Sequence, residues 1–410
     1  MKVDFLYNWA IDLYDFVIHL AAPFSRKPRK MMKGHWVVYE LLRQQVEPGE
    51  RYIWFHAASL GEFEQGRPLI EKIRAKYPDY KILLTFFSPS GYEVRKHYRG
   101  ADIVCYLPFD KPRNVRKFLS ITNPCMAFFI KYEFWKNYLD ELHRRRIPVY
   151  SVSSIFRRDQ IFFKWYGGTY RDVLKDFDHL FVQNEASKRY LSKLGINRVT
   201  VVGDTRFDRV LQIREEAKEL PLVDRFKGEN RFTFVAGSSW GPDEDLFLEY
   251  FNTHPEMKLI IAPHVIDENH LVEIVGKLRR PYVRYTRADE RNVLRADCLI
   301  IDCFGLLSST YRYGEVAYIG GGFGAGIHNT LEAAVYGIPV LFGPKFQKFQ
   351  EAVRLIEAKG AYPVNDYPEL ENLLDLLHDD HFRIATGQNA NRYVIDNSGA
   401  TDRVMAMINF

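Results

Sequence analysis

Two carboxylates in the first half of the sequence directly follow apolar runs that have the composition of buried strands. Glu62 ends the segment HAASLGE, after residues 52–57, and Glu133 lies in KYEFW, after residues 125–130. A carboxylate at the carboxyl end of a strand can take a proton from an attacking hydroxyl. An ordinary acidic residue in a first helical turn, where the helix dipole favours negative charge, explains each position equally well.

Arginine and hydroxyl side chains follow other predicted strands. Arg206, in GDTRFD, has the charge to offset that of a leaving phosphate, with a surface ion pair as the alternative. Ser238 and Ser239 end a strand and precede a helix, which is a plausible place for a phosphate contact. Further strand ends in the second half carry residues at the same kind of position: Pro263, His264, Phe304 and Gly305.

A glycine-rich stretch, GGGFGAGIHNTLE, occupies residues 320–332. An apolar run leads into it and a helical pattern at residues 331–336 leads out. This arrangement directs backbone N–H groups at a phosphate, and glycines such as Gly322 let the backbone come close. The spacing is not the dinucleotide fingerprint, and a merely tight turn is the alternative. Asn329 and Glu332, which could bind a ribose, favour a nucleotide site.

Two series of alternating strands and helices must position these residues. In the first half we expect strands at 52–57, 81–87, 103–107, 125–130, 149–153, 179–182 and 198–202, and helices at 62–76, 91–98, 133–144 and 162–174. In the second half we expect strands at 232–236, 258–262, 298–302, 315–319 and 338–342, and helices at 243–251, 268–278, 346–358, 368–377 and 380–410. The alternation predicts two parallel α/β halves that bind ligands beyond the carboxyl ends of their strands, in a cleft between them.

The stretch 204–230 is rich in charge and lacks an apolar strand, so it is the predicted interdomain link. It separates an amino-terminal Rossmann-like domain, residues 35–203, from a carboxyl-terminal one, residues 231–390. Residues 391–410 are expected to form a helix that packs back on the first domain.

The composition is that of a two-domain globular protein, because 410 residues exceed one ordinary core and 47% of them are hydrophobic. A net charge of only +5, with cations scattered among acids, argues against a nucleic-acid partner. The four cysteines have no C-x-x-C spacing, which indicates buried free thiols in a reducing compartment. No residue set has metal-ligand spacing, and no signal peptide is recognisable.

Residues 3–22 form a helical pattern with one narrow polar stripe, made of Asp4, Asn8, Asp12, Asp15 and His19. Aspartates near mid-span are costly in a bilayer, so an interfacial helix is favoured over a transmembrane one. A basic cluster within residues 26–33 follows and would attract anionic headgroups. We therefore expect residues 1–34 to be a membrane-associated helix and basic segment whose polar stripe faces the protein; a helix packed on the domain is the alternative.

In this order, the segments HAASLGE, KYEFW, GDTRFD, AGSSW, HNTLEAA and GIPVLFGP resemble those of the 3-deoxy-D-manno-octulosonic acid (Kdo) transferases of lipopolysaccharide synthesis. The resemblance implies an α/β fold of two Rossmann-like domains facing a cleft, the GT-B glycosyltransferase class. It also implies an inverting enzyme with CMP-Kdo as donor and a lipid A precursor as acceptor. The expected location is the cytoplasmic face of the inner membrane, and no metal or other cofactor is expected.

The resemblance assigns roles to individual residues. It makes Glu62 the general base, and Glu133 with Arg206 the pair that stabilises the transition state. It suggests that CMP is contacted by residues of the second half: Ser238, Ser239, Pro263, His264, Phe304, Gly305, Leu306, Gly322, Asn329, Thr330, Leu331 and Glu332. The chain departs from the family pattern at three positions, where the family usually has Arg for His264, often Glu for Leu306 and usually Lys for Arg206.

Two other functions are compatible with parts of this pattern. One is another sugar-nucleotide enzyme with two such domains, a UDP-sugar transferase or an epimerase, which UDP rather than CMP would stabilise. The other is a non-catalytic lipid-binding relative, against which the intact set of Glu62, Glu133 and Arg206 argues.

Overall fold

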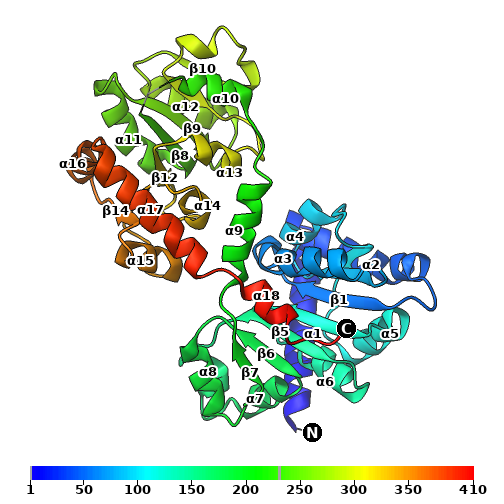
Figure 1. Cartoon of the computed structure of the whole chain (residues 1–410). Coiled ribbons are helices and arrows are strands. Elements are labelled where there is room, and N and C mark those ends of the chain that lie inside the picture. Colours follow the sequence, from blue (N-terminus) through cyan, green and yellow to red (C-terminus); the bar gives the residue numbers. More distant parts are fainter. Residues whose placement is uncertain (1, 230–231) are drawn as a thin grey trace. The chain divides into compact units, whose positions relative to one another are not determined.

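The computed structural model describes residues 2–229 and 232–410, and the chain divides into two compact units. The first unit comprises residues up to 209 together with 398–410, and the second comprises residues 210–397. Asn230, the last residue of the predicted link, and residue 231 lie outside the described part, as does the side chain of Asp4. Each unit is a parallel sheet covered by helices, as Figure 1 shows.

The first unit holds a seven-stranded sheet in the order β3-β2-β1-β4-β5-β6-β7, with every pair parallel. Its strands are β1 (Tyr52–Ala57), β2 (Lys81–Phe86), β3 (Ile103–Tyr106), β4 (Met126–Ile130), β5 (Val149–Ser154), β6 (His179–Val182) and β7 (Val199–Val201). Its helices are α1 (Lys2–Ala21), α2 (Arg26–Gln45), α3 (Leu60–Lys76), α4 (Pro89–Arg95), α5 (Pro112–Thr122), α6 (Lys136–Arg144), η1 (Ile161–Phe163), α7 (Gly168–Lys175), α8 (Glu185–Ser192) and α18 (Ala400–Met405).

The second unit repeats the plan with the order β10-β11-β9-β8-β12-β13-β14, again parallel throughout. Its strands are β8 (Thr233–Ser239), β9 (Lys258–Pro263), β10 (Tyr282–Arg284), β11 (Cys298–Ile300), β12 (Val316–Ile319), β13 (Val340–Phe342) and β14 (Ala361–Pro363). Its α-helices are α10 (Pro221–Lys227), α11 (Gly241–Thr253), α12 (Glu268–Lys277), α13 (Leu307–Thr310), α14 (Leu331–Ala334), α15 (Gln350–Glu357), α16 (Tyr367–Leu377) and α17 (Asp380–Asp396), with short turns at η2 (Tyr285–Arg287), η3 (Val293–Arg295) and η4 (Tyr311–Tyr313). Helix α9 (Thr205–Glu215) runs across the boundary of the two units.

Both faces of the first sheet are buried, which explains why its central strands are apolar along their whole length. Alternate residues of β1 enter different cores: Trp54 packs in one, and Ile53 and Phe55 in the other. The core that contains Ile53 and Phe55 also includes Val404 and Ile408, so residues 398–410 pack with the first unit. The predicted fold class, two parallel α/β halves, is confirmed.

Several predicted elements differ from the structure. The helix expected over 133–144 begins only at Lys136, so Glu133 lies in the preceding loop and not in a first helical turn. The helix expected over 162–174 is the short turn η1 followed by α7, because the loop between them bends back at Gly167. The basic segment after α1 is itself helical, as α2. The cysteines are free as expected, although Cys125 and Cys303 are only partly buried.

Helix α1 contacts the first unit through its polar stripe. Lys111 Nζ pairs with carboxylate oxygens of Asp12 and Asp15 at 2.8 and 2.7 Å, and the Asn137 amide donates to Asn8 Oδ1 at 2.8 Å. The opposite face of the helix is therefore apolar and exposed, which reverses the usual arrangement of a surface helix. Its exposed large side chains are Phe5, Leu6, Trp9, Leu13, Phe16, Val17 and Leu20.

A buried carboxylate beneath α1 makes the stability of the first unit depend on pH. Asp110 accepts hydrogen bonds from the Tyr7 hydroxyl at 2.6 Å and from the backbone N–H groups of Asn137 and Tyr138, both at 3.0 Å. Burial outweighs these donors and raises the pKa of Asp110 to about 6. The folded state thus binds this proton more tightly than the unfolded state, so the contribution is complete below the unfolded pKa and is lost as pH rises through about 6.

We expect the free energy of unfolding of the wild type, relative to that of Asp110→Asn, to rise as the pH falls from about 7.5 to about 5. Raising the pKa of Asp110 from 3.8 to about 6 corresponds to about 3 kcal/mol in the free energy of unfolding when the whole range is titrated. Denaturant titrations at several pH values measure the free energy of unfolding of both proteins. The contributions of titratable groups that both proteins share cancel in the difference. A difference that stays flat, or falls over this range, would contradict the raised pKa.

Candidate functional site

Glu133 lies at the carboxyl edge of the first sheet and is held by two donors. Trp135 Nε1 donates to Glu133 Oε2 at 2.6 Å, and His56 Nε2 lies 3.1 Å from the same oxygen. The Glu133 side chain is nearly buried and that of His56 is fully buried. The two contacts to Oε2 fix the Glu133 carboxylate in one orientation. Because β1 and β4 are neighbours in the sheet, His56 at the end of one reaches Glu133 just beyond the other.

His56 is itself fixed from behind. The imidazole is fully buried, and its Nδ1 lies 2.9 Å from Thr85 Oγ1 and 3.2 Å from the Thr85 carbonyl oxygen. Thr85 Oγ1 also accepts a hydrogen bond from Trp54 Nε1 at 2.8 Å. Sequence reasoning did not single out His56 or Thr85, although each is a polar residue within an otherwise apolar strand, which is an informative signal.

Glu62 lies in the first turn of α3, which follows β1. Its side chain is half-buried, and the hydroxyl of Ser59, the residue before the helix, donates to Glu62 Oε2. A half-buried carboxylate at a sheet edge remains accessible to a ligand, so the geometry is compatible with a general base. The ordinary first-turn acid remains compatible as well.

Arg206 is paired with the nearly buried Asp204. Its Nε and Nη2 lie 2.8 and 2.7 Å from Asp204 Oδ2, and its backbone N–H donates to Oδ1 at 2.9 Å. Gln65 of α3 donates to the same Oδ1 at 3.3 Å. The ion pair weighed as an alternative thus exists, and the Gln65 contact joins the Arg206 loop to the helix that carries Glu62.

In the second unit, the first glycines of the 320–332 stretch serve close packing of the backbone. A Cβ on Gly322 would lie 2.5 Å from the Cα of Gly343, and one on Gly320 would overlap the carbonyl of Ser238. The Gly321 N–H, expected to face a ligand, donates to Asp243 Oδ2 at 2.9 Å. The tight-turn interpretation therefore accounts for this part of the stretch.

We expect Gly322→Ala to destabilise the second unit by about 1–3 kcal/mol, because an added methyl must push two backbones apart. Gly324→Ala in the same loop is the matched control, since the nearest atom to its Cβ is 3.6 Å away. Thermal unfolding of both variants tests the difference. Equal unfolding midpoints would show that the Gly322–Gly343 contact is not tight.

Three aromatic rings stack at the carboxyl edge of the second sheet. The Trp240 and His264 rings lie 4.7 Å apart, those of His264 and His328 lie 4.4 Å apart, and Trp240 Nε1 donates to His328 Nε2 at 3.4 Å. Burial, and then the adjacent His264, lower the pKa of His328, which suits its role as an acceptor. Of these residues only His264 was predicted, because pairing across three separate loops leaves no local pattern.

Ser239, the residue before Trp240, is held by hydrogen bonds within the second unit. Ser239 Oγ donates to the buried Glu244 at 2.9 Å, and His270 Nε2 lies 2.9 Å from the other oxygen of that carboxylate. Ser238 takes a left-handed backbone conformation, with φ at 53°, where β8 has an irregular register with β9. Pro263, at the end of β9, pairs in register with Ser239.

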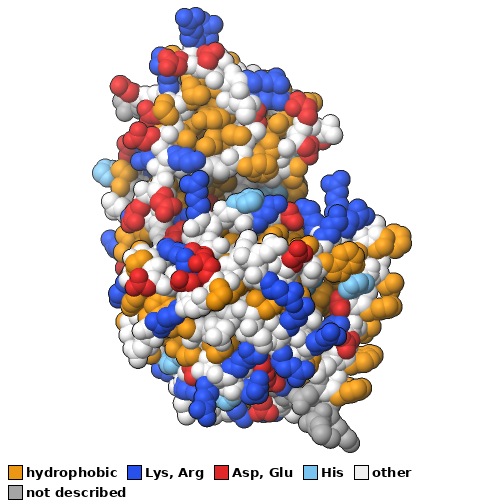
Figure 2. Space-filling model, turned by 90° about the vertical axis from the view of Figure 1, so that its right-hand side faces the viewer, with side chains coloured by type: hydrophobic (Ala, Val, Ile, Leu, Met, Phe, Trp, Pro, Cys, Tyr) orange, Lys and Arg blue, Asp and Glu red, His pale blue; other side chains and the backbone are white. Residues whose placement is uncertain are grey.

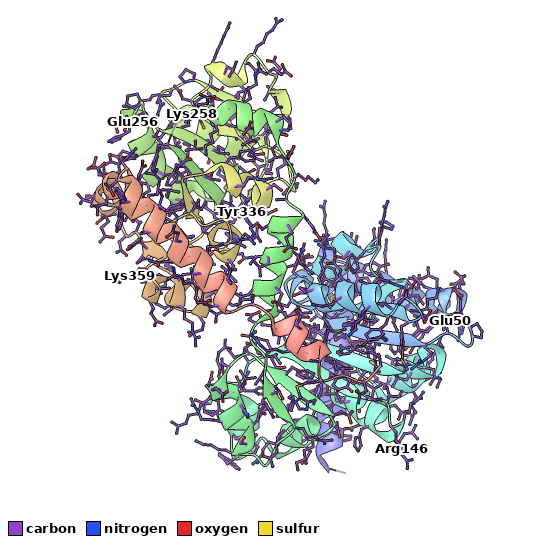
Figure 3. The ribbon with its side chains drawn as sticks, in the orientation of Figure 1. Glu50, Arg146, Glu256, Lys258, Tyr336 and Lys359 are labelled. Carbon is purple, nitrogen blue, oxygen red and sulfur yellow. The ribbon has the colours of Figure 1, made fainter. Side chains whose placement is uncertain are left out.

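The helix after the glycine-rich loop is shorter than predicted, because α14 has only four residues. Asn329 Nδ2 donates to Glu332 Oε1 at 3.0 Å, and the Leu331 N–H donates to Asn329 Oδ1 at 3.2 Å, so that N–H is not directed at a ligand. Thr330 is buried. Tyr336, which follows α14 and is labelled in Figure 3, has a buried hydroxyl that no group of the described residues pairs with by a hydrogen bond.

The remaining predicted contacts form the turn after β11. Phe304 is exposed, Gly305 has a φ of 86°, and the carbonyl of Leu306 accepts the first bonds of α13. Among the described residues, no group of three or more His, Cys, Asp and Glu side chains could hold a metal ion.

Two parallel sheets with polar side chains at the carboxyl ends of their strands define an α/β protein of the GT-B type. Solved structures share this fold at low identity. The UDP-GlcNAc 2-epimerase of Neisseria meningitidis aligns with 87% of this chain and 98% of its own, with a TM-score of 0.62 and 15% identity. A putative UDP-N-acetylglucosamine 2-epimerase of Listeria monocytogenes covers 87% and 95%, with a TM-score of 0.58 and 15% identity.

Sequence comparison is more specific. Residues 33–209 match the family model described as 3-deoxy-D-manno-octulosonic-acid transferase. Proteins named 3-deoxy-D-manno-octulosonic acid transferase from Aquifex aeolicus and Bordetella pertussis are each 27% identical to the chain, covering 78% and 86% of it and 83% and 86% of their own lengths. The Haemophilus influenzae protein of that name is 24% identical over 88% of the chain and 87% of its own length. Over most of its length the chain is therefore similar to the Kdo transferases, a family of glycosyltransferases.

Proposed function

We propose that this protein transfers Kdo from CMP-Kdo to a lipid A precursor with inversion at the anomeric carbon, in lipopolysaccharide core synthesis. The observation that carries the proposal is the position of Glu62, Glu133 and Arg206. All three fall within the matched residues 33–209. Glu62 lies on α3, His56 of β1 contacts Glu133, and Arg206 pairs with Asp204, which accepts a hydrogen bond from Gln65 of α3. A non-catalytic relative would have no need to keep this arrangement.

In the proposed reaction, the acceptor's sugar hydroxyl lies at the carboxyl edge of the first sheet. Glu62 removes its proton as the hydroxyl oxygen bonds to the anomeric carbon of Kdo, and the bond from that carbon to the phosphate oxygen of CMP breaks. Glu133, fixed by His56 and Trp135, faces developing positive charge, and Arg206 offsets the negative charge of the departing CMP. The electron pair leaves with CMP, and no cofactor takes part.

The donor is proposed to bind at the carboxyl edge of the second sheet. The stacked rings of Trp240, His264 and His328 offer an apolar face beside the hydroxyls of the Ser238–Ser239 turn. Asn329 and Glu332, already paired with each other, are the proposed ribose contacts. Because α14 is too short for a substantial dipole, side chains must contribute more of the phosphate binding than the glycine-rich pattern suggested.

The exposed apolar face of α1 supports association with the cytoplasmic face of the inner membrane, where a lipid acceptor lies. Figure 2 shows a row of hydrophobic side chains along one margin of the first unit, with Lys and Arg side chains beside it. Lys and Arg residues of 26–33 are mostly exposed and would contact anionic headgroups. None of the helices in the described part of the chain has both the length and the apolar character needed to span a bilayer.

The test is to incubate the purified full chain with CMP-Kdo and a tetraacylated lipid A precursor, with and without EDTA, and to identify the product by mass. Kdo-modified acceptor and free CMP, unaffected by EDTA, would support the proposal. Thermal protection by CMP but not UDP would separate it from a UDP-sugar enzyme. Lipid binding without CMP release would instead identify a non-catalytic relative.

A further inference from the structure

A short loop of the first unit displays two large aromatic side chains away from the core. Trp165 and Tyr166, at its tip, are 91% and 60% exposed. Its base is anchored, because Phe162 is buried in the unit's core. Adjacent large side chains exposed in this way form an apolar patch, and such patches can mark a binding surface.

The backbone holds this tip in a defined shape. The Lys164 N–H donates to the Ile161 carbonyl at 3.1 Å, and the Gly167 N–H donates to the Lys164 carbonyl at 3.0 Å. Any side chain at Gly167 would overlap the carbonyl of Ile161, so glycine is required for the return of the chain. Two aromatic rings on a closed, hydrogen-bonded loop need little further ordering before they bind.

Ring contacts connect this loop to α1. Tyr7 of α1 lies 6.5 Å from Tyr170 in an edge-to-face arrangement, and Tyr170 lies 6.5 Å from Phe162 in the same way. The loop is therefore a neighbour of the helix whose apolar face is exposed. The two aromatic groups belong to one region of the first unit although about 150 residues separate them in the chain.

The charge around the loop favours an anionic partner. Residues 155–171 contain four cations, Arg157, Arg158, Lys164 and Arg171, and one acid, Asp159. Both Arg157 and Arg158 are exposed. Trp and Tyr rings flanked by cations are typical of segments that lie at the headgroup level of a bilayer, where the ring is buried and its polar atom stays hydrated.

We propose that the Trp165–Tyr166 tip is a second membrane contact, which inserts into an anionic lipid surface alongside the exposed face of α1. Two separate contacts would fix the orientation of the first unit on the membrane. With α1 as the single contact, the unit could still rotate about the axis of that helix. This inference rests on the membrane association proposed above and adds a specific binding segment to it. A protein partner at this tip is the competing occupant, and it predicts no lipid binding by the loop.

The test compares vesicle binding of full-length variants. W165S/Y166S removes the tip, W9S/F16S removes part of the α1 face, and L376S/I384S replaces two exposed apolar residues of the second unit as the matched control. Partition to vesicles of phosphatidylcholine, with and without phosphatidylglycerol, is measured by co-sedimentation. We expect W165S/Y166S to lower partition to anionic vesicles at least about tenfold, W9S/F16S to lower it similarly, and the control to match the wild type.

A fluorescence measurement identifies the inserted ring directly. Quenching by brominated lipids should be weaker in W165F than in the wild type, because one inserted indole is lost while the ring volume is largely kept. Wild-type partition by W165S/Y166S, with loss by W9S/F16S, would overturn the second contact and leave the α1 contact standing. Failure of the wild type to bind either vesicle would overturn membrane association itself. The assay of Kdo transfer to a detergent-dispersed acceptor would still test the proposed reaction independently.

Discussion

We expect Glu62→Gln to lower Kdo transfer by about 10²–10⁴-fold while the protein stays folded, since that is the usual contribution of a general base. Glutamine keeps the size and can still accept the hydrogen bond from Ser59, but it cannot take a proton from the acceptor hydroxyl. Because the proposed donor site lies in the second unit, CMP should protect the variant against thermal unfolding as it protects the wild type. The measurements are turnover with saturating CMP-Kdo and the shift of the unfolding midpoint with CMP.

The matched control is Glu71→Gln, on the same helix but paired with Arg67 and Tyr98. It removes one carboxylate from α3 and should retain most of the activity. Near-normal turnover of Glu62→Gln would remove Glu62 as the base and leave it as a first-turn acid of α3. Loss of both transfer and CMP protection would indicate that the substitution acts on the fold.

The second large effect is expected at His56, which contacts no substrate in the proposal and acts by positioning Glu133. His56→Leu removes a donor to Oε2, and hydrogen bonds to charged groups of this kind correspond to about a 10- to 100-fold loss in turnover. His56→Gln can place an amide N–H near the position of Nε2, so it should recover much of that loss.

A purely structural role for His56 makes a different prediction. Thermal midpoints would then fall in parallel with turnover, and His56→Gln would recover turnover only as far as it recovers the midpoint. Thr85→Val removes the hydroxyl behind His56 Nδ1 and should cause a smaller loss in the same direction. Thr122→Val is its control, because that buried hydroxyl donates only to the backbone carbonyl of Phe118. Equal effects of the two threonine variants on turnover would contradict the positioning role.

Much of the architecture could be predicted from residue patterns because parallel strands buried on both faces leave a strong local signal. The run YIWFHA is apolar up to His56, and β1 occupies its six residues as predicted. Edge strands such as β10 and β14 have three residues each and only partial burial, so their patterns are too short to recognise. Helix boundaries failed where the chain turns sharply, as at Gly167, whose close approach to the Ile161 carbonyl interrupts the helix predicted over 162–174.

The sequence by itself determined candidate residues for the chemistry and roughly where each lies, since Glu62, Glu133 and Arg206 follow predicted strands. Tertiary structure alone decided the pairings: His56 with Glu133, Asp204 with Arg206, and Trp240 with two histidines. It also decided that α1 turns its polar stripe inward, because Lys111 and Asn137 lie far along the chain from their partners. Patterns within one element report burial and charge, whereas a hydrogen bond between distant elements depends on strand order and on the space that neighbouring side chains leave.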